Sequence, residues 1–241
     1  MAVIDMQIRI VAVGSKRWER WLRRWGVSFL IEEDILFDTF GDPGLFLRNA
    51  RRFNIDFSKI RHIVISHDDW DHITGLWYII NRYKDVTVYI CPNFKQEIKD
   101  RIASFGVNII EASRLLGIKD DIYSTGQMDG RSEGRIVFEQ SLIIKSTDGL
   151  IVITGCAHPG IINIVENVKK QFRGDIHLIL GGLHLKNSAE GQICELISKL
   201  RNYGVNKVAP VHCTGGLAIK LIKKEYNNNF IQMKQGSIIE V

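Results

Sequence analysis

The sequence predicts an α+β fold in which β-sheets are covered by helices on their outer faces. Short apolar runs typical of strands dominate the first half of the 241 residues. From about residue 150 onward, strand and helix patterns alternate. Sheets that bury one face need helices to cover them, which favours this layered class of fold. No internal repeat, low-complexity tract or linker interrupts the pattern, so we expect a single domain over residues 1–241.

The expected elements follow from apolar runs bounded by polar residues, Gly or Pro. In the first half we expect strands at residues 7–13, 27–31, 35–37, 61–65, 86–90 and 107–111, and helices at residues 45–53, 74–83 and 93–104. In the second half we expect strands at residues 136–147, 150–154, 176–180, 207–209 and 237–241, and helices at residues 161–172, 189–203 and 217–226. Pro43 suits a helix start, and Asp148-Gly149 is a strong hairpin signal. Residues 112–135 have only weak periodicity and predict no regular element.

The composition is that of an ordinary soluble globular protein, with 45% apolar and 24% charged residues. No apolar run approaches the roughly 18 residues of a membrane span, and residues 1–11 do not resemble a secretory signal. The four cysteines form no close Cys-x-x-Cys pair. We therefore expect a reduced, cytoplasmic location and no membrane partner.

Arginines and tryptophans interleave in residues 16–25, which carry much of the excess behind the net charge of +5. One interpretation is a surface for nucleic acid or an anionic ligand, because guanidinium and indole groups stack on bases. The other is a short amphipathic helix whose Trp18, Trp21 and Trp25 pack on the core. The helical spacing favours the second interpretation, so we do not expect a nucleic-acid partner. Attraction of an anionic substrate fits either one.

Residues 61–75 carry the most chemistry, because an apolar run at 63–65 ends in a cluster of acidic and imidazole side chains. The cluster reads Ser66, His67, Asp68, Asp69, Trp70, Asp71 and His72. Packed carboxylates resist ionising together, and a bound cation removes that conflict. A solvated acidic loop with hydrogen-bonded histidines is the alternative. The alternation of His67, Asp69 and Asp71 favours a metal site.

Three later strands also end in potential metal ligands. The runs at 150–154, 176–180 and 207–209 each lead into a turn of small residues followed by His or Cys. These turns contain Cys156, His158, His184, His212 and Cys213. Four such turns in one domain favour a metal site, since imidazole is the commonest metal ligand and strand ends commonly carry ligand sites. His62 and His177 lie in strands, and we expect both to be structural.

Two of these turns also open helices, at Thr74 and at Thr214-Gly215. Free N–H groups at a helix N-terminus favour anions, so Thr214 and Gly215 are candidates for binding a phosphate or carboxylate. An equally good interpretation is that Thr74 and Thr214 are N-caps.

Together these motifs resemble the metallo-β-lactamase superfamily, whose signature is His-x-His-x-Asp-His. The matching residues are Asp38 after a strand, Ser66-His67-x-Asp69-x-Asp71-His72, Thr154-Gly155-Cys156 with His158, and Pro210-x-His212. The resemblance extends from about residue 7 to 241 and implies a four-layer αββα sandwich with a dinuclear metal site along one sheet edge. Residues 154–161, 181–185 and 212–215 resemble a branch of metal-dependent hydrolases that includes dihydropterin ribofuranosyl-aminobenzene phosphate synthase-like proteins. This branch implies an anionic substrate.

Carried over residue by residue, the resemblance implies two divalent cations. One would be held by His67, Asp69 and His158, and the other by Asp71, His72 and His212. Cys156 and His184 are alternative or additional ligands, and either His184 or His212 could be the last ligand of the family pattern. Asp38 would orient a ligand or a backbone turn.

The sequence departs from the family pattern at two positions. Asp69 replaces the second histidine of the signature, and Cys156 stands where the bridging aspartate is usual. A carboxylate favours iron or manganese, whereas a thiolate favours zinc or iron. We expect zinc, with iron or manganese as alternatives.

The resemblance implies a hydrolase that attacks an ester, lactone or phosphoester of an anionic small molecule with a metal-bridged water. Asp71 would position the water, and His184 or a metal would stabilise the developing oxyanion. Two alternatives remain open. One is a di-iron redox protein, suggested by Asp69, and the other is a non-catalytic ligand-binding member with a degraded metal site.

Overall fold

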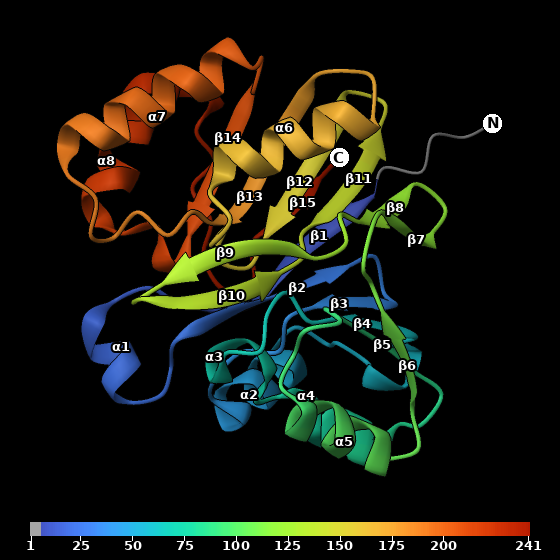
Figure 1. Ribbon diagram of the computed structural model, residues 1–241. Coiled ribbons are helices and arrows are strands. Elements are labelled where there is room, and N and C mark those ends of the chain that lie inside the picture. Colours follow the sequence, from blue (N-terminus) through green and yellow to red (C-terminus); the bar gives the residue numbers. More distant parts are fainter. Residues whose placement is uncertain (1–5) are drawn as a thin grey trace. The chain divides into compact units, whose positions relative to one another are not determined.

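The computed structural model describes residues 6–241, which form two compact units (Figure 1). Unit 1 comprises the described residues up to Ser113 together with Lys234–Val241, and unit 2 comprises Arg114–Met233. Each unit contains a mixed β-sheet and several helices. The predicted α+β class, with sheets flanked by helices, is confirmed. The prediction of a single domain over residues 1–241 stays a prediction.

Unit 1 is built on a seven-stranded sheet with the order β15-β1-β2-β3-β4-β5-β6. Its strands are β1 (Gln7–Gly14), β2 (Gly26–Ile31), β3 (Ile35–Phe37), β4 (His62–Val64), β5 (Thr87–Ile90), β6 (Asn108–Glu111) and β15 (Ile238–Glu240). The pairs from β15 to β3 are antiparallel, and those from β3 to β6 are parallel. The carboxyl ends of β3 and β4 therefore lie side by side, and the residues that follow them can meet.

The helices of unit 1 connect these strands. They are α1 (Arg17–Trp21), α2 (Pro43–Arg52), the 3₁₀ turn η1 (Phe57–Lys59), α3 (Trp70–Ile73), α4 (Leu76–Arg82) and α5 (Gln96–Ser104). Asp42 caps α2 by accepting a hydrogen bond from the Leu45 N–H over 2.9 Å, and Pro43 occupies the first helical position. This cap ends the segment that follows β3 and begins α2.

Unit 2 contains a six-stranded sheet with the order β14-β13-β12-β11-β8-β7 and a separate hairpin of β9 and β10. Its strands are β7 (Leu116–Lys119), β8 (Ile122–Ser124), β9 (Met128–Ser132), β10 (Arg135–Glu139), β11 (Leu142–Ser146), β12 (Gly149–Thr154), β13 (Ile176–Gly182) and β14 (Lys207–Val211). Strands β12, β13 and β14 run parallel, so their carboxyl ends share one edge of the sheet. The predicted Asp148-Gly149 hairpin joins β11 to β12, with Ser146 opposite Gly149.

The core of unit 2 lies between this sheet and its helices. The helical elements are α6 (Ile161–Gln171), α7 (Glu190–Asn202), η2 (His212–Thr214), α8 (Gly216–Tyr226) and η3 (Asn227–Asn229). Ile161, Ile164, Val165 and Val168 recur at helical spacing and give α6 a buried face. They join one apolar cluster with residues of β12, β13, β14, α7 and α8, which fixes the strand ends that carry the candidate ligands.

The structure differs from the sequence predictions in the least periodic segments. Residues 112–135 contain β7, β8 and β9, whose short strands alternate too weakly to be recognised. The helix expected at residues 74–83 is α4, which begins at Leu76 after its N-cap Gly75, and a separate short helix, α3, precedes it. A Cβ on Gly75 would lie 2.2 Å from the Thr39 carbonyl oxygen, so this turn packs directly against the segment after β3.

The predicted packing of three tryptophans on the core is wrong for two of them. Trp25 is buried, but Trp18 is 54% and Trp21 is 91% exposed. Helix α1 has only five residues and ends before Trp25. The helical spacing therefore does not hold across residues 16–25, and the three rings do not share one face.

Among residues 6–241, no helix is both long enough and apolar enough to cross a bilayer.

Gly26 at the start of β2 gives a direct test of how this sheet meets α3. Its φ is +111°, and an added Cβ would lie 1.9 Å from the Asp71 carbonyl oxygen. Gly26→Ala should therefore destabilise unit 1 through both backbone strain and a backbone clash. We expect a clear fall in the urea midpoint, measured by circular dichroism.

Gly106→Ala is the matched control, because Gly106 also has a positive φ, of +71°, but nothing lies within 4 Å of an added Cβ. It should lose only the ~1–2 kcal/mol expected for a left-handed non-glycine residue. Equal losses for the two variants would contradict the close contact at Gly26.

Candidate functional site

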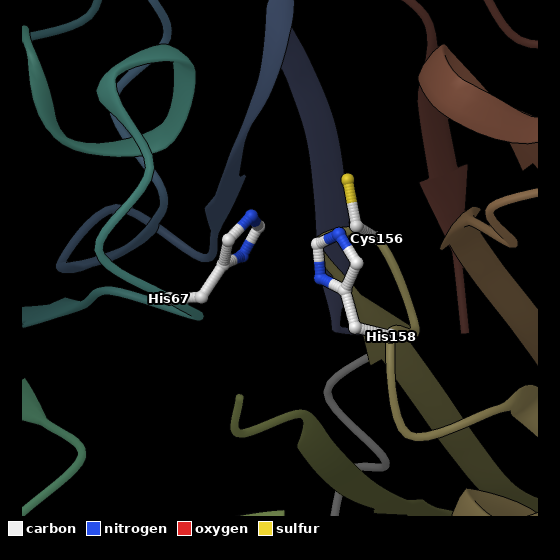
Figure 2. Close-up of side chains that lie close together, drawn as sticks. All are labelled: His67, Cys156 and His158. Atoms are coloured by element: carbon white, nitrogen blue, oxygen red, sulfur yellow. The ribbon is translucent and has the colours of Figure 1, made fainter. Parts of the chain in front are cut away.

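The unit 1 part of the candidate site is the turn between β4 and α3. His67 and Asp69 lie in this turn and Asp71 and His72 lie in α3 itself, and all four are predicted ligands. His67, Asp71 and His72 are buried, and the Asp69 side chain is 20% exposed. Apolar residues of β4 and Ile65 anchor the start of this turn in the core. The local sequence thus ends a buried strand in a turn from which polar side chains such as His67 project (Figure 2).

Asp38 organises this turn from the end of the neighbouring parallel strand β3. Its Oδ1 accepts from the Ser66 N–H over 2.7 Å. Its Oδ2 accepts from the Ser66 hydroxyl over 2.8 Å and lies 2.6 Å from His72 Nδ1. Asp38 is fully buried, and a buried carboxylate needs such donors to offset its lost hydration. The contact with His72 is the kind expected of Asp38 from the sequence.

These contacts determine which ring nitrogens carry protons. Because the Ser66 hydroxyl donates to Asp38, it accepts from His67 Nδ1, which lies 2.8 Å away. His72 likewise donates from Nδ1 to Asp38. When these rings are neutral, Nε2 carries the lone pair, and neutral imidazole with its Nδ1–H held by an oxygen is the usual arrangement of a metal-binding histidine.

The Nε2 atoms lie close to the remaining carboxylates of the turn. His67 Nε2 is 3.7 Å from Asp69 Oδ2, and His72 Nε2 is 3.4 Å from Asp71 Oδ2. Both separations are longer than a good N–H···O bond. They approach the spacing of two ligand atoms that each bind one ion at about 2.0–2.2 Å.

The pKa of His72 reflects the same charges. Burial of the ring lowers its pKa, but the carboxylates of Asp38 and Asp71 outweigh burial and hold the pKa well above its ordinary value. Burial also raises the pKa of Asp38, and His72 and Ser66 offset part of that effect. The surroundings of His72 therefore favour a positive charge, which either a proton or a cation can supply.

The unit 2 part begins in the turn after β12, where Cys156 and His158 project (Figure 2). Glu139, at the end of β10, holds this turn. Its carboxylate accepts from the backbone N–H groups of Cys156, Ala157 and His158 over 2.8–2.9 Å. It also lies 2.8 Å from His158 Nδ1. His158 thus has its Nδ1–H directed at a buried carboxylate, as His72 does in unit 1.

Glu139 is absent from the site residues predicted from the sequence. It is 1% exposed, although glutamate is rarely buried without partners. In the sequence it is a single acidic residue at the end of an apolar run, with no motif around it. Its contacts form only when the β9–β10 hairpin meets the turn after β12, so no local signal could have identified it.

His184 and His212 follow β13 and β14, at the same sheet edge as Cys156. Both have left-handed backbones, with φ of +51° and +52°. Asp38 and Ala157 share this feature, with φ of +58° and +60°. Non-glycine residues seldom adopt this conformation, and such strain is concentrated at functional sites.

Three side chains of unit 2 present potential ligand atoms to one another. One atom from each of Cys156, His184 and Cys213 lies within 4.8 Å of the other two. The His184 Nδ1 is buried and has no hydrogen-bond partner among residues 6–241. Burial tends to raise the pKa of Cys213, but a hydrogen bond with Cys156 and the nearby His212 and His184 hold it well below its ordinary value. Cys213 is not among the ligands that the family resemblance implies.

Other expectations concern residues near these turns. The Thr214 hydroxyl donates to Val211 O over 2.7 Å and accepts from the Leu183 N–H over 3.1 Å, so it caps no helix. The predicted anion site at Thr214 and Gly215 therefore depends on the backbone at the start of α8, where Gly215 is the N-cap. Thr74 donates to Trp70 O and ends α3, so it is not an N-cap either.

The two histidines expected to be structural have ordinary partners. His62 Nδ1 lies 3.0 Å from the Tyr89 hydroxyl. His177 Nε2 lies 3.7 Å from Asp148, and burial lowers the pKa of this ring. Neither belongs to a group of potential ligands in the described part of the chain.

The donor set fits divalent cations. Unit 1 contributes two imidazoles with their Nδ1 atoms held, each beside a carboxylate. Unit 2 contributes thiols and imidazoles, and the His184 Nδ1 is buried without a hydrogen-bond partner among residues 6–241. Imidazole, carboxylate and thiolate are the ligands that zinc and iron prefer. The assignment of individual ligands to individual ions stays a prediction.

Comparison with known proteins supports this chemistry. The model of the beta-lactamase superfamily domain matches residues 33–119, which include Asp38 and the β4–α3 turn. A Methanocaldococcus jannaschii protein named 7,8-dihydropterin-6-methyl-4-(beta-D-ribofuranosyl)-aminobenzene-5'-phosphate synthase is 27% identical, over 89% of this chain and 89% of its own. An uncharacterised protein of the same organism is 30% identical, over 96% of this chain and 99% of its own.

Solved structures show the same fold. Tm1679, described as a metal-dependent hydrolase of the β-lactamase superfamily, matches with a TM-score of 0.78 and 25% identity, over 98% of this chain and 99% of its own. The metallo-β-lactamase fold protein YhfI from Bacillus subtilis matches with a TM-score of 0.71 and 13% identity, over 98% of this chain and 100% of its own. In fold, in sequence and in its His- and Asp-bearing turns, the chain belongs to the metallo-β-lactamase superfamily.

Proposed function

We propose that the protein is a hydrolase that uses two divalent cations, most favourably zinc, to cleave an ester, lactone or phosphoester of an anionic small molecule. The observation that carries this proposal is the shared arrangement of His67, His72 and His158. Each has its Nδ1 within 2.8 Å of a buried side-chain oxygen, which leaves Nε2 as the coordinating atom. Three histidines with purely structural roles would have no reason to share the same tautomer.

The proposed ligands come from both units. Unit 1 offers His67, Asp69, Asp71 and His72, with Asp38 and Ser66 as positioning residues. Unit 2 offers His158 and His212, with Glu139 as the positioning residue. Cys156 and His184 are further ligand candidates.

When bound, divalent cations supply Lewis-acid chemistry and lower the pKa of water. The protein's own residues would then orient the reaction. The Asp71 carboxylate would accept a hydrogen bond from the attacking water and direct its lone pair. The imidazole of His184 would donate a hydrogen bond to the developing oxyanion if it is not itself a ligand.

An anionic substrate is supported by the start of α8 and by a relative's name. The first N–H groups of α8 follow Gly215, whose backbone packs against that of Lys186. The synthase that is 27% identical to this chain has a 5'-phosphate in its name. We propose a phosphorylated or carboxylated small molecule as the substrate, and a cytoplasmic location, where the four free cysteines stay reduced.

Metal removal tests the function directly. Protein stripped with a chelator and reconstituted with Zn²⁺, Mn²⁺ or Fe²⁺ should be assayed on phosphodiester, lactone and thioester panels. We expect at least one substrate to be hydrolysed about 100-fold faster or more with metal, because Lewis-acid assistance contributes several kcal/mol. His67→Ala should lose activity and part of its bound metal, whereas His62→Ala, which changes a strand histidine of the same unit, should retain its activity and all of its metal.

Two results would contradict the proposal. A protein that holds its metals but hydrolyses no substrate would be a ligand-binding member of the superfamily. A protein that is active in electron transfer only with iron would be a di-iron redox protein.

Asp69→His restores the usual histidine of the superfamily signature and tests metal choice. Replacing a hard carboxylate with an imidazole should shift the preference from manganese or iron toward zinc. Competitive loading followed by elemental analysis measures the ratio. Asp68→Asn is the control, since the Asp68 carboxylate accepts from the Lys95 N–H and should not affect the ratio. An unchanged ratio in Asp69→His would show that Asp69 is not a ligand.

Glu139→Gln tests how the turn after β12 is held. The Glu139 carboxylate accepts hydrogen bonds from N–H groups of the turn. The NH₂ group of glutamine would face these donors instead, so the orientation of His158 should loosen. Metal affinity, measured by competition with a chromophoric chelator, should fall about 10–100-fold. Glu195→Gln on α7, where the carboxylate is exposed and pairs with Lys199, should leave affinity unchanged. Equal affinities for the two variants would remove Glu139 from the site.

A further inference from the structure

Three neighbouring strand ends of unit 2 converge on a group of thiols and an imidazole. Strands β12, β13 and β14 are parallel, with Thr154 opposite Gly181 and Gly182 opposite Val211. Cys156, His184 and Cys213 each lie two residues after the end of one of these strands. The topology therefore delivers one potential ligand from each strand to the same sheet edge.

The side chains meet in unit 2, where both cysteines are buried and His184 is partly exposed. Cys156 and Cys213 are 4% and 2% exposed. One ligand atom from each of the three residues lies within 4.8 Å of the other two. The His184 Nδ1 is buried and has no hydrogen-bond partner among residues 6–241. A buried polar nitrogen without a partner is costly unless a ligand satisfies it.

Gly182, on the central strand, makes room for this group. A Cβ at this position would lie 2.7 Å from Cys213 Sγ and 3.2 Å from Cys156 Cα. Any larger residue would push the Cys213 sulfur out of the group. Strand β13 thus has no side chain at the position where the two cysteines approach each other.

The chemistry of the three donors selects the kind of ion. Thiolate and imidazole are ligands of zinc-class cations, whereas Mg²⁺ and Mn²⁺ prefer oxygen. In tetrahedral zinc sites, Zn–S bonds of about 2.3 Å and Zn–N bonds of about 2.0–2.1 Å place ligand atoms roughly 3.4–3.8 Å apart. Because the three donor atoms lie within 4.8 Å of one another, they would have to close by at most about 1.4 Å around an ion.

We propose that Cys156, His184 and Cys213 form a thiolate–imidazole site for one zinc-class cation, built by unit 2 alone. The inference rests on the proposed metal dependence and deepens it, because it adds Cys213 as a ligand and makes His184 a ligand rather than an oxyanion donor. Binding would release the two thiol protons to solvent and leave the fourth coordination position for water or substrate.

Cobalt substitution tests this site without relying on activity. Co²⁺ bound by thiolate gives a sulfur-to-metal charge-transfer band in the near ultraviolet, and cobalt bound only by nitrogen and oxygen does not. The stripped, fully reduced protein should be titrated with Co²⁺ as wild type, Cys213→Ser, Cys156→Ser and the double variant. Cys194→Ser is the matched control, because Cys194 is an exposed free cysteine on α7. Circular dichroism of each variant establishes that it is folded.

We expect a charge-transfer band in the wild type and in Cys194→Ser. The band should fall by about half in each single variant at the site and vanish in the double variant, since thiolates bind cobalt and zinc in the same kind of site. His67→Ala should keep the band, because His67 is not one of the three proposed donors.

Three outcomes would overturn the inference. The first is cobalt binding by the wild type without a thiolate band. The second is a band unchanged in folded Cys213→Ser. The third is a protein that, isolated without reductant, has two fewer titratable thiols and a mass lower by two hydrogens, which would make the pair a disulfide. Failure of the proposed function can be told apart from failure of this site. A thiolate band in a protein that hydrolyses no panel substrate would contradict the hydrolase function but support the thiolate–imidazole site.

Discussion

The buried carboxylate of Asp38 is the constraint on which the β4–α3 turn of unit 1 depends. A carboxylate without solvent is stable only if several donors satisfy it, and Asp38 has the Ser66 N–H, the Ser66 hydroxyl and His72. Because these donors are fixed, the Ser66 hydroxyl must accept from His67. One charge in the core thus sets the orientation and the tautomer of two histidines. The β3–β4 parallel pairing makes this possible by ending both strands at the same edge.

Unit 2 uses the same physical device with different residues. Glu139 accepts from three backbone N–H groups and lies against His158, so it shapes the turn as well as the ring. The left-handed backbones of His184 and His212 add strain that the surrounding core must support. Rigid strand ends, buried counter-charges and strained turns would together preorganise the proposed ligands for an ion.

Much of this arrangement could be predicted from the sequence, because apolar strands that end in His, Asp or Cys are local patterns. The class of fold and the strand ends carrying His67, His158 and His212 followed from them. Glu139 could not be predicted, since its partners are distant in the chain and its own neighbourhood is unremarkable. For Trp18 and Trp21 the local pattern was misleading. Their helical spacing predicted burial, but α1 is too short to place them on one buried face, and both are exposed. The proposed role of Cys213 depends on the β12–β13–β14 register and on the glycine between the two cysteines, which the sequence alone does not bring together.

The central claim is that buried oxygens hold Nδ1 of the site histidines so that Nε2 binds metal. The most direct test is a crystal structure of the zinc-reconstituted protein with anomalous diffraction data collected at the zinc edge. The account predicts zinc peaks at about 2.0–2.1 Å from Nε2 of His67, His72 and His158, with their Nδ1 atoms still on Ser66, Asp38 and Glu139. Zinc bound through Nδ1 of these residues, or no zinc on any of them, would contradict it.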